Sequence, residues 1–325
     1  MKKKLSILIP TVNHNKFIDK TIASCLNHSL SSSFEIIVSV NNLTLFGFEK
    51  SNYFKHKNIR WKCLRKQTVS MPESLNSGLK FCTCDWLFIL SDDDCITKEF
   101  LQNFSLSHLN SNNLYTTRIR LVDENEHIIE EKEKYSKNIF SRNEALDLFF
   151  NDKIDHHLST FVFNRALFDK TDGYHTSGYP NGYFIDSVLH CKLISNCESL
   201  HTADEVVFER RIFPNQSSMA FYFNKNVNIY IKNVVESFLQ DENVTYQILK
   251  RYRTKKIFYR LFLKKRFKTE WFKLRKINYT NRLIKRSELI FFYFLYWDAG
   301  LLNKLHSIIF IIKYFIALIT PKYTK

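Results

Sequence analysis

The sequence predicts an α/β fold: a mostly parallel sheet flanked by helices, followed by a helical extension at the C-terminus. Over the first hundred residues, short apolar runs of strand length alternate with apolar residues at helical spacing. This alternation is typical of a parallel sheet covered on both faces. From about residue 224 onward the pattern is helical, aromatic and basic. None of the six glycines forms a dinucleotide-binding or P-loop motif, so neither of those nucleotide-binding folds is expected.

The first hundred residues predict four strands and two helices. Each strand is a short apolar or alternating run, and the four runs cover residues 5–9, 36–40, 59–64 and 86–90. Apolar residues at three- and four-residue spacing predict helices over residues 15–28 and near residues 75–82. Ligands bind beyond the carboxyl ends of such strands, so residues 10–13, 41–42 and 91–94 should meet at one edge.

The middle of the chain is less regular. Residues 114–131 predict a hairpin that turns at residues 123–125, and residues 157–163 predict a strand. Half of the glycines fall within residues 173–182, which predicts a mobile loop before a helix that begins near Phe184.

Three consecutive carboxylates, Asp92, Asp93 and Asp94, follow Ser91 directly after the strand predicted at residues 86–90. Adjacent carboxylates repel one another unless a counter-charge is present. A divalent cation with diphosphate oxygens would supply that charge, because hard oxygen ligands suit Mg²⁺ and Mn²⁺. The alternative is an acidic loop that caps a helix near Lys98.

The net charge of +16 is concentrated in one segment. Residues 250–286 contain 16 Lys and Arg against one acid, Glu270, which gives +15 and leaves +1 for the other 288 residues. Aromatic residues at helical spacing lie between these charges, which favours a helix in the interface of an anionic membrane. The apolar runs at 289–297 and 308–319, nine and twelve residues, are shorter than the ~20 that span a bilayer.

The seven cysteines include no C-x-x-C pair, and the first ten residues lack the apolar core of a secretory signal. We therefore expect a cytoplasmic protein with reduced thiols, attached peripherally to the inner face of the cell membrane.

Five segments together resemble family 2 glycosyltransferases with the GT-A fold, of the type that builds bacterial cell-surface polysaccharides. They are SILIPTVNHNKFI (6–18), FEIIVSVNN (34–42), ESLNSGLKFCTCDWLFILSDDD (73–94), DGYHTSGYPNGYFIDSVLHCKLI (172–194) and RIFPNQSS (211–218). Their order and spacing match those of the family over residues 5–218.

The resemblance implies an inverting, metal-dependent enzyme. It would use Mn²⁺ or Mg²⁺ and transfer a sugar from a nucleotide-sugar donor, expected to be UDP-linked, to a glycan or lipid-linked acceptor. Residues 1–100 would form the nucleotide-sugar-binding half of the GT-A domain and residues 101–222 the acceptor-binding half. Residues 223–325 would form the membrane-associating region.

The resemblance also implies a role for particular residues. Thr11 and Asn13 would face the nucleotide base, and Asn41 or Asn42 would contact the base or ribose. Lys66 and Asn76 would help to hold the nucleotide or its diphosphate. Asp186 would be the catalytic base. The acidic triplet can be aligned with the family motif in two ways. One alignment makes Asp93 the leading metal ligand and places Asp92 near the ribose and diphosphate. The other makes Asp92 and Asp94 the metal ligands. We therefore take Asp93 and Asp94 as the metal candidates.

Several positions depart from the family pattern. Val12 replaces an aromatic residue, Val40 stands where an Asp reads the base and ribose, and Cys84 replaces a glycine. Phe213 stands where a His that binds metal or phosphate is common, so Arg210 or Arg211 would carry the diphosphate charge.

Three other interpretations stay open. The basic segment could bind nucleic acid, although its confinement to the last third and the acidic triplet argue against nucleic acid as a partner. A sugar-nucleotide pyrophosphorylase is disfavoured because its glycine-rich loop after the first strand is absent. The protein could also be a catalytically degenerate member of the family.

Overall fold

The computed structural model describes residues 5–26, 34–41, 47–64, 69–100, 109–175, 184–213 and 227–252, with the backbone alone for 227–232. The first four strands of this part form a parallel sheet in the order β3-β2-β1-β4. Their bounds are Leu5–Thr11 (β1), Phe34–Val40 (β2), Ile59–Cys63 (β3) and Trp86–Ile89 (β4). The prediction of a parallel sheet over the first hundred residues is confirmed.

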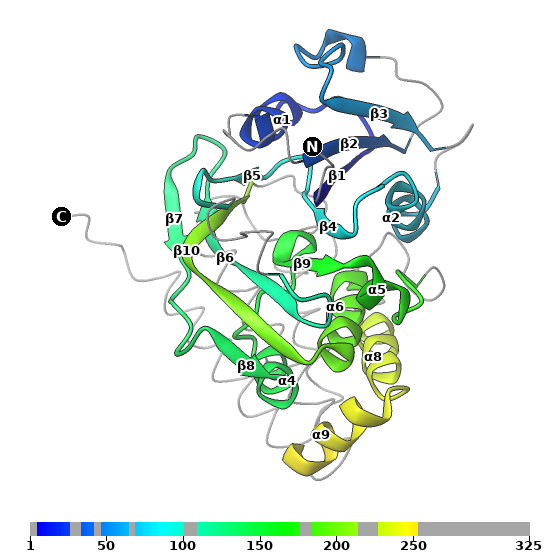
Figure 1. The fold of residues 1–325 in the computed structure, drawn as a ribbon, viewed down its shortest axis with the longest axis vertical. Coiled ribbons are helices and arrows are strands. Elements are labelled where there is room, and N and C mark those ends of the chain that lie inside the picture. Colours follow the sequence, from blue (N-terminus) through cyan, green and yellow to red (C-terminus); the bar gives the residue numbers. More distant parts are fainter. Residues whose placement is uncertain are drawn as a thin grey trace, which may run out of the picture.

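The same sheet continues through the middle of the chain as β9-β6-β10-β5, with β7 beside β6 and β8 beside β10. The strands are Cys95–Ile96 (β5), Leu114–Val122 (β6), Ile128–Glu131 (β7), Ile139–Ser141 (β8), Phe161–Asn164 (β9) and Ser199–Arg211 (β10). Strands β6 and β10 are parallel, whereas the other pairings in this half are antiparallel. One mixed sheet therefore carries both halves (Figure 1).

The expected hairpin over residues 114–131 is confirmed as β6 and β7. The strand expected over residues 157–163 is shorter than predicted. A 3₁₀ turn, Leu158–Thr160, precedes β9, which begins only at Phe161. The His157 ring accepts a hydrogen bond from the Ser159 N–H, and the Thr160 hydroxyl accepts one from the His157 N–H. These local bonds favour a turn over an extended strand.

Helices cover both faces of the sheet. Their bounds are Ile18–Leu26 (α1), Met71–Leu79 (α2), Arg142–Phe150 (α4), Arg165–Asp169 (α5), Ile185–Asn196 (α6), Val227–Phe238 (α8) and Glu242–Tyr252 (α9), and a 3₁₀ helix lies at Phe48–Lys50. Alternation along β1 separates two cores: Ile7 packs with Ile22 of α1, and Leu8 packs with Leu75 of α2. Helices α4, α6, α8 and α9 pack on the same side of the sheet and contribute side chains to the core that contains Leu8 (Figure 1).

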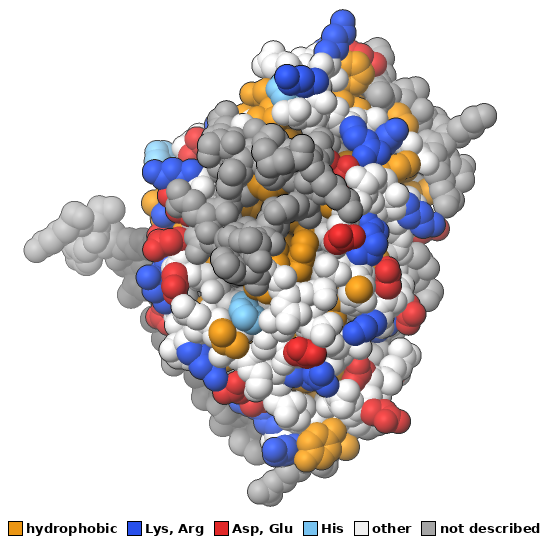
Figure 2. Space-filling model, viewed as in Figure 1, with side chains coloured by type: hydrophobic (Ala, Val, Ile, Leu, Met, Phe, Trp, Pro, Cys, Tyr) orange, Lys and Arg blue, Asp and Glu red, His pale blue; other side chains and the backbone are white. Residues whose placement is uncertain are grey.

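The described surface mixes both charge signs. On the face in Figure 2, Lys and Arg side chains lie between Asp and Glu side chains. None of the helices in the described ranges is long and apolar enough to cross a membrane. Helices α8 and α9 begin the expected C-terminal extension, while most of the basic segment at 250–286 lies outside the described residues.

Candidate functional site

The carboxyl ends of the parallel strands meet at one edge, as the sequence predicts. The Asn41 N–H, after β2, donates to the Thr11 carbonyl at 2.7 Å, and the Leu90 N–H, after β4, donates to the Leu8 carbonyl at 2.9 Å. These two bonds bring residues 10–13, 41 and 91–94 together. Asn42 and Lys66, two predicted nucleotide-binding residues, lie outside the described residues.

Asp92 is held directly by the loop that follows β1. Its Oδ2 accepts hydrogen bonds from the Thr11 hydroxyl at 2.5 Å and from Asn15 Nδ2 at 2.8 Å. The other amide atom of Asn15, Oδ1, accepts from the N–H groups of Phe17 and Ile18 at the start of α1. Asn15 therefore joins the acidic loop to the beginning of a helix. The sequence pattern marked Asn15 only as a helix start.

Asn13 and Asn41 occupy different environments at this edge. The Asn13 side chain is exposed, and its carbonyl accepts a hydrogen bond from the Thr11 hydroxyl at 3.0 Å. The Asn41 side chain is buried, and its amide pairs with both backbone groups of Val69, at 2.8 and 2.9 Å. This pairing fixes the segment immediately before α2. Asn13 is thus the more accessible of the two for a ligand.

Arg211 ties the acidic loop to the end of β10. Its backbone N–H donates to Asp94 Oδ1 at 2.7 Å, and its Nε donates to the Asp93 carbonyl at 3.0 Å. The guanidinium also donates to the Asp123 carbonyl at 3.2 Å and lies 4.6 Å from the centre of the Phe17 ring. We expected Arg211 to contact the donor diphosphate. In the structure its side chain is only 2% exposed and is engaged by the protein itself.

The other arginine considered for the diphosphate, Arg210, is also buried. Its Nη1 lies 3.3 Å from Asp155 Oδ1, which forms a buried ion pair.

His157 lies beside the buried carboxylate of the triplet. The register of β4 and β9 pairs Trp86 with Asn164 and Phe88 with Val162. The same register, extended beyond the strands, places Ser159 opposite Ser91. The Ser91 N–H donates to the Ser159 hydroxyl at 3.2 Å. This places His157 Nε2 3.6 Å from Asp94 Oδ2. The local pattern indicated His157 only as a strand-entry residue.

The electrostatics of the triplet reflect its crowding. Burial raises the pKa of Asp92 to about 7, the charge of Asp93 adds to the rise, and the hydrogen bonds from Thr11 and Asn15 oppose it. Burial, followed by the charge of Asp93, raises the pKa of Asp94 well above its ordinary value. Carboxylates with raised pKa values favour a nearby cation, because a positive charge stabilises their ionised form.

Within the described ranges, no three His, Cys, Asp or Glu side chains converge on one point as a metal-binding group. Asp94 is fully buried, and its Oδ2 accepts no hydrogen bond from any described residue. Mg²⁺ is commonly held by one or two carboxylates, with substrate phosphates and water completing the coordination. The oxygen donors of the acidic loop fit that kind of site.

Asp186 lies in the first turn of α6, where the helix dipole favours a negative charge. Its side chain is half-buried. The residue before the helix, Phe184, has a left-handed φ of 63°, a conformation that non-glycine residues rarely adopt outside constrained sites. The helix expected near Phe184 is confirmed.

Two consecutive histidines connect the acidic loop with the start of α6. His157 faces Asp94, and His156 Nδ1 lies 3.0 Å from the hydroxyl of Ser187, the residue after Asp186. The other nitrogen of His156 lies 3.2 Å from the Phe149 carbonyl, and its ring stacks on Phe149. The contacts of His156 could not be predicted from the sequence, because its partners Phe149 and Ser187 are 7 and 31 residues away along the chain.

Asn76, expected at the nucleotide, contacts the backbone of Tyr174. Its Nδ2 donates to the Tyr174 carbonyl at 2.8 Å, and its Oδ1 accepts from the Tyr174 N–H at 2.9 Å.

Comparisons with known proteins agree with this architecture. The sequence model described as Glycosyl transferase family 2 matches residues 6–171, which are 166 of the 325 residues. Poly(ribitol-phosphate) beta-N-acetylglucosaminyltransferase TarP of Staphylococcus aureus (strain N315) is 29% identical over 103 residues. That match covers 31% of this chain and 32% of TarP, so it spans about a third of the curated relative.

Solved structures of S. aureus TarS have a similar fold. TarS 1–349 in complex with UDP-GlcNAc gives a TM-score of 0.62 at 16% identity, and TarS 1–349 alone gives 0.59. Each of these matches covers 91% of this chain and 80% of the TarS chain. A longer TarS structure gives 0.59 at 14% identity, with 48% of that chain covered. At such identities the likeness concerns the fold.

Proposed function

The chain belongs to glycosyl transferase family 2, and on this premise we propose that it transfers a sugar from a UDP-linked donor to a glycan or lipid-linked acceptor. The observation that carries the proposal is the edge where Thr11 and Asn15 hold Asp92 and Arg211 holds Asp93 and Asp94. This cluster lies at the carboxyl ends of β1 and β4, where nucleotides bind in open α/β sheets.

For the donor, UDP-GlcNAc is the first candidate. TarS was crystallised with UDP-GlcNAc, and the name of TarP describes an N-acetylglucosaminyltransferase. In this proposal Thr11, Asn13 and Asn42, the last of which lies outside the described residues, face the nucleoside, and Asp92 lies near the ribose and diphosphate. Lys66 would add positive charge near the diphosphate.

We assign the catalytic base to Asp186. The acceptor hydroxyl attacks the anomeric carbon from the face opposite the nucleotide, so the new C–O bond forms as the bond to the diphosphate breaks. The bonding electron pair leaves with the diphosphate, and the hydroxyl proton passes to Asp186. This displacement inverts the anomeric configuration. Asp186 lies in the first turn of α6, where the helix dipole favours a negative charge.

Asp93 would hold a divalent cation, Mn²⁺ or Mg²⁺, and Asp94 is the second candidate ligand. Asp93 is half-buried and therefore accessible, whereas Asp94 is fully buried between Arg211 and His157. When bound, such a cation stabilises the negative charge that builds on the departing diphosphate.

For the acceptor we propose a glycan-like polymer or its lipid-linked precursor at the cytoplasmic face of the membrane. The name of TarP points to poly(ribitol-phosphate) as one acceptor to test. Peripheral attachment through residues 250–286 would place the enzyme near a lipid-linked acceptor.

A donor and metal panel tests the proposal. Purified full-length protein is incubated with UDP-, GDP- and dTDP-sugars, with or without Mn²⁺ or Mg²⁺, and nucleotide release and transfer are measured. We expect turnover of a UDP-sugar that depends on the cation. Asp186→Asn should retain donor binding but lower transfer by about 10²–10⁴-fold, the usual contribution of a general base.

Asp93→Ala provides the matched test of the cation site. It should abolish cation-dependent turnover while the protein stays folded, because an acidic loop contributes little to the core. If Asp93→Ala turned over as fast as the wild type at saturating Mn²⁺, the assignment of the metal ligand would be wrong. If no donor were bound or hydrolysed by the wild type, the proposed activity itself would be wrong.

A further inference from the structure

The contact between Asn76 and Tyr174 joins two parts of the chain that are 98 residues apart. The Asn76 amide pairs with both backbone groups of Tyr174, much as one strand pairs with another. Each end of the amide has a partner of the right kind, since the NH₂ donates and the oxygen accepts. The pairing therefore fixes the position of the Tyr174 backbone relative to α2.

Gly173 is adapted to this close approach. It has a left-handed φ of +71°, and a Cβ at this position would lie 2.8 Å from Asn76 Oδ1. Any other residue would be strained by its backbone conformation and would also push against the amide. Two separate features of the segment thus depend on the same contact.

Helix α2, which carries Asn76, is seated closely on the sheet. A Cβ at Gly78 would lie 2.8 Å from Ser39 Oγ and 3.1 Å from the Leu8 side chain, so the helix backbone approaches both β1 and β2. Ser70 and Glu73 form a capping box that fixes the first turn of the helix. Asn76 is therefore a rigid extension of the nucleotide-binding half.

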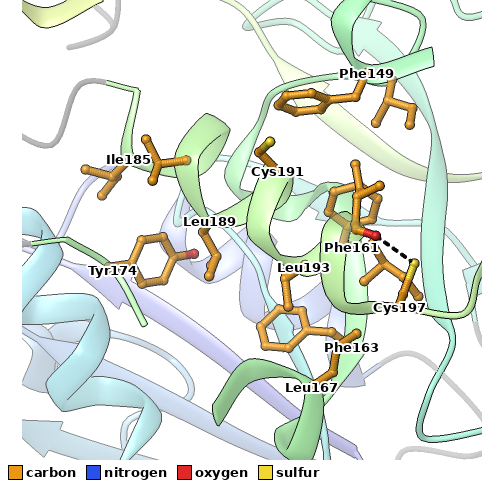
Figure 3. Packing of buried hydrophobic residues seen from close by; sticks show 14 of the residues in the cluster. Phe149, Phe161, Phe163, Leu167, Tyr174, Ile185, Leu189, Cys191, Leu193 and Cys197 are labelled. Atoms are coloured by element: carbon orange, nitrogen blue, oxygen red, sulfur yellow. Dashed lines mark hydrogen bonds between the residues drawn. The ribbon is translucent and has the colours of Figure 1, made fainter. Parts of the chain in front are cut away.

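The same short segment, residues 171–175, is fastened to α6 on its other side. Lys192 Nζ donates to the Thr171 carbonyl at 3.2 Å and lies 2.7 Å from His175 Nε2. The Tyr174 side chain is buried in the core, where Figure 3 shows its ring beside Leu189 and Ile185 of α6. Ile185 immediately precedes Asp186.

We propose that Asn76 is a positioning residue for Asp186 rather than a ligand of the nucleotide. It holds residues 171–175 against α2, and these residues contact α6 at two places, near its start through Tyr174 and further along the helix through Lys192. The coupling sets the location of the base relative to the sheet edge where the donor would bind. This inference rests on the proposed function, in which Asp186 is the base.

Charge supports the same arrangement. Burial raises the pKa of Tyr174 well above its ordinary value, and the negative charge of Asp186 adds to the rise. The Tyr174 hydroxyl therefore lies within the electrostatic influence of Asp186.

The test compares Asn76→Asp and Asn76→Ala with wild type in the full-length protein. Asn76→Asp keeps the size and the acceptor for the Tyr174 N–H but turns a carboxylate oxygen toward the Tyr174 carbonyl. We expect both variants to bind UDP-GlcNAc with unchanged Kd by calorimetry. Their kcat should fall by up to about 10²-fold, the cost of a small misplacement of reacting groups. Asn138→Ala is the matched control, because its exposed side-chain amide donates to Asp204 at the surface.

Hydrogen exchange supplies a readout that does not depend on activity. In Asn76→Ala, the amides of residues 185–190 should exchange faster than in wild type, while those of β1 and β2 should not. Gly173→Ala should slow turnover in the wild-type background but have a smaller effect when combined with Asn76→Ala, which removes the opposing oxygen.

Two results would overturn the inference. A weaker UDP-GlcNAc affinity with unchanged kcat would make Asn76 a nucleotide ligand. Unchanged exchange at residues 185–190 in Asn76→Ala would show that the contact does not hold α6. If wild type neither bound UDP-GlcNAc nor transferred sugar, the proposed function would fail, and the exchange measurement would still decide whether Asn76 positions α6.

Discussion

Arg211 has the largest side chain among the fully buried residues of the described part, and it places a positive charge inside the protein beside the acidic triplet. Three elements meet at its guanidinium: the acidic loop at Asp93, the β6–β7 turn at Asp123 and Glu126, and the Phe17 ring before α1. A counter-charge at this point offsets the repulsion within the acidic triplet. The loop can therefore keep its shape before a ligand arrives.

Arg211→Met should lower the free energy of unfolding by about 2–4 kcal/mol, because buried carbonyls lose their donors. Arg211→Lys should recover only part of this loss, since an ammonium group cannot reproduce the fork of a guanidinium. Urea denaturation followed by circular dichroism measures both.

Arg251→Met is the control for Arg211→Met. It removes a partly exposed ion pair with Asp147 and should cost no more than about 1 kcal/mol. If Arg211→Met cost no more than Arg251→Met, Arg211 would not hold the acidic loop.

Glu35 on β2 makes stability depend on pH. Burial by itself raises its pKa, but hydrogen bonds from Ser6 and from both the N–H and hydroxyl of Thr83, together with Arg60, outweigh burial and lower the pKa below its ordinary value of 4.5. A depressed pKa in the folded state means that the unfolded chain binds a proton first as the pH falls. The stabilisation is therefore complete above the unfolded-state pKa and is lost as pH falls through the folded-state pKa.

We predict that the urea concentration at the unfolding midpoint decreases as the pH is lowered from about 5 to about 3. This range lies around and below the pKa of Glu in an unfolded chain. Glu35→Gln should be less stable at pH 7 and should show a smaller decrease over that range. A pH dependence identical to that of wild type would mean that Glu35 does not contribute to it.

At the scale of the elements, α2 has a tight contact with the sheet that depends on one glycine. Because a Cβ at Gly78 would lie 2.8 Å from Ser39 Oγ and 3.1 Å from Leu8, Gly78→Ala must displace the helix or a side chain. Overpacking of this kind costs about 1–3 kcal/mol. The higher helix propensity of Ala returns about 1 kcal/mol. We therefore predict a net loss of stability for Gly78→Ala in urea denaturation.

The double variant Ser39→Ala with Gly78→Ala separates the clash from other effects. Removing the Ser39 hydroxyl makes room for the added methyl, so the double variant should be more stable than the sum of the single changes predicts. Additive losses would place the cost of Gly78→Ala elsewhere, for example at Leu8.

The pairing of distant strands explains why only part of the site could be predicted from the sequence. Local apolar runs were sufficient to predict strands β1, β2 and β4. They were therefore also sufficient to predict the sheet edge that carries Thr11 and Asp92. His157 and Arg211 reach that edge through antiparallel registers, Phe88 with Val162 and Phe208 with Ile96. Strand β5 is only two residues long, and β10 has register shifts between Thr202 and Phe208, so neither register leaves a regular local pattern.

At the scale of the whole molecule, the excess positive charge is concentrated in one segment of the chain rather than on one face of the described structure. The described surface carries both signs (Figure 2), while residues 250–286 carry a net charge of +15 from 16 basic residues and Glu270. Each basic residue near an anionic membrane contributes about 1 kcal/mol of binding, so we expect part of this segment to be sufficient for attachment. We expect the apolar and aromatic residues between the charges to add a contribution to membrane binding that salt does not screen.

We predict that the full-length protein sediments with anionic liposomes at low salt and is partly released at high salt, because the Debye length falls from about 10 Å at 0.1 M to about 3 Å at 1 M. Replacing Lys264, Lys265 and Arg266 by Glu should greatly reduce this binding. Replacing the exposed Lys55, Lys57 and Lys98 by Glu makes the same change in net charge and should leave the binding nearly intact. Equal losses from the two triple variants would mean that overall charge, rather than the basic segment, governs attachment. Absence of binding at low salt, combined with a shift of RNA in a gel, would instead make nucleic acid the partner of the segment.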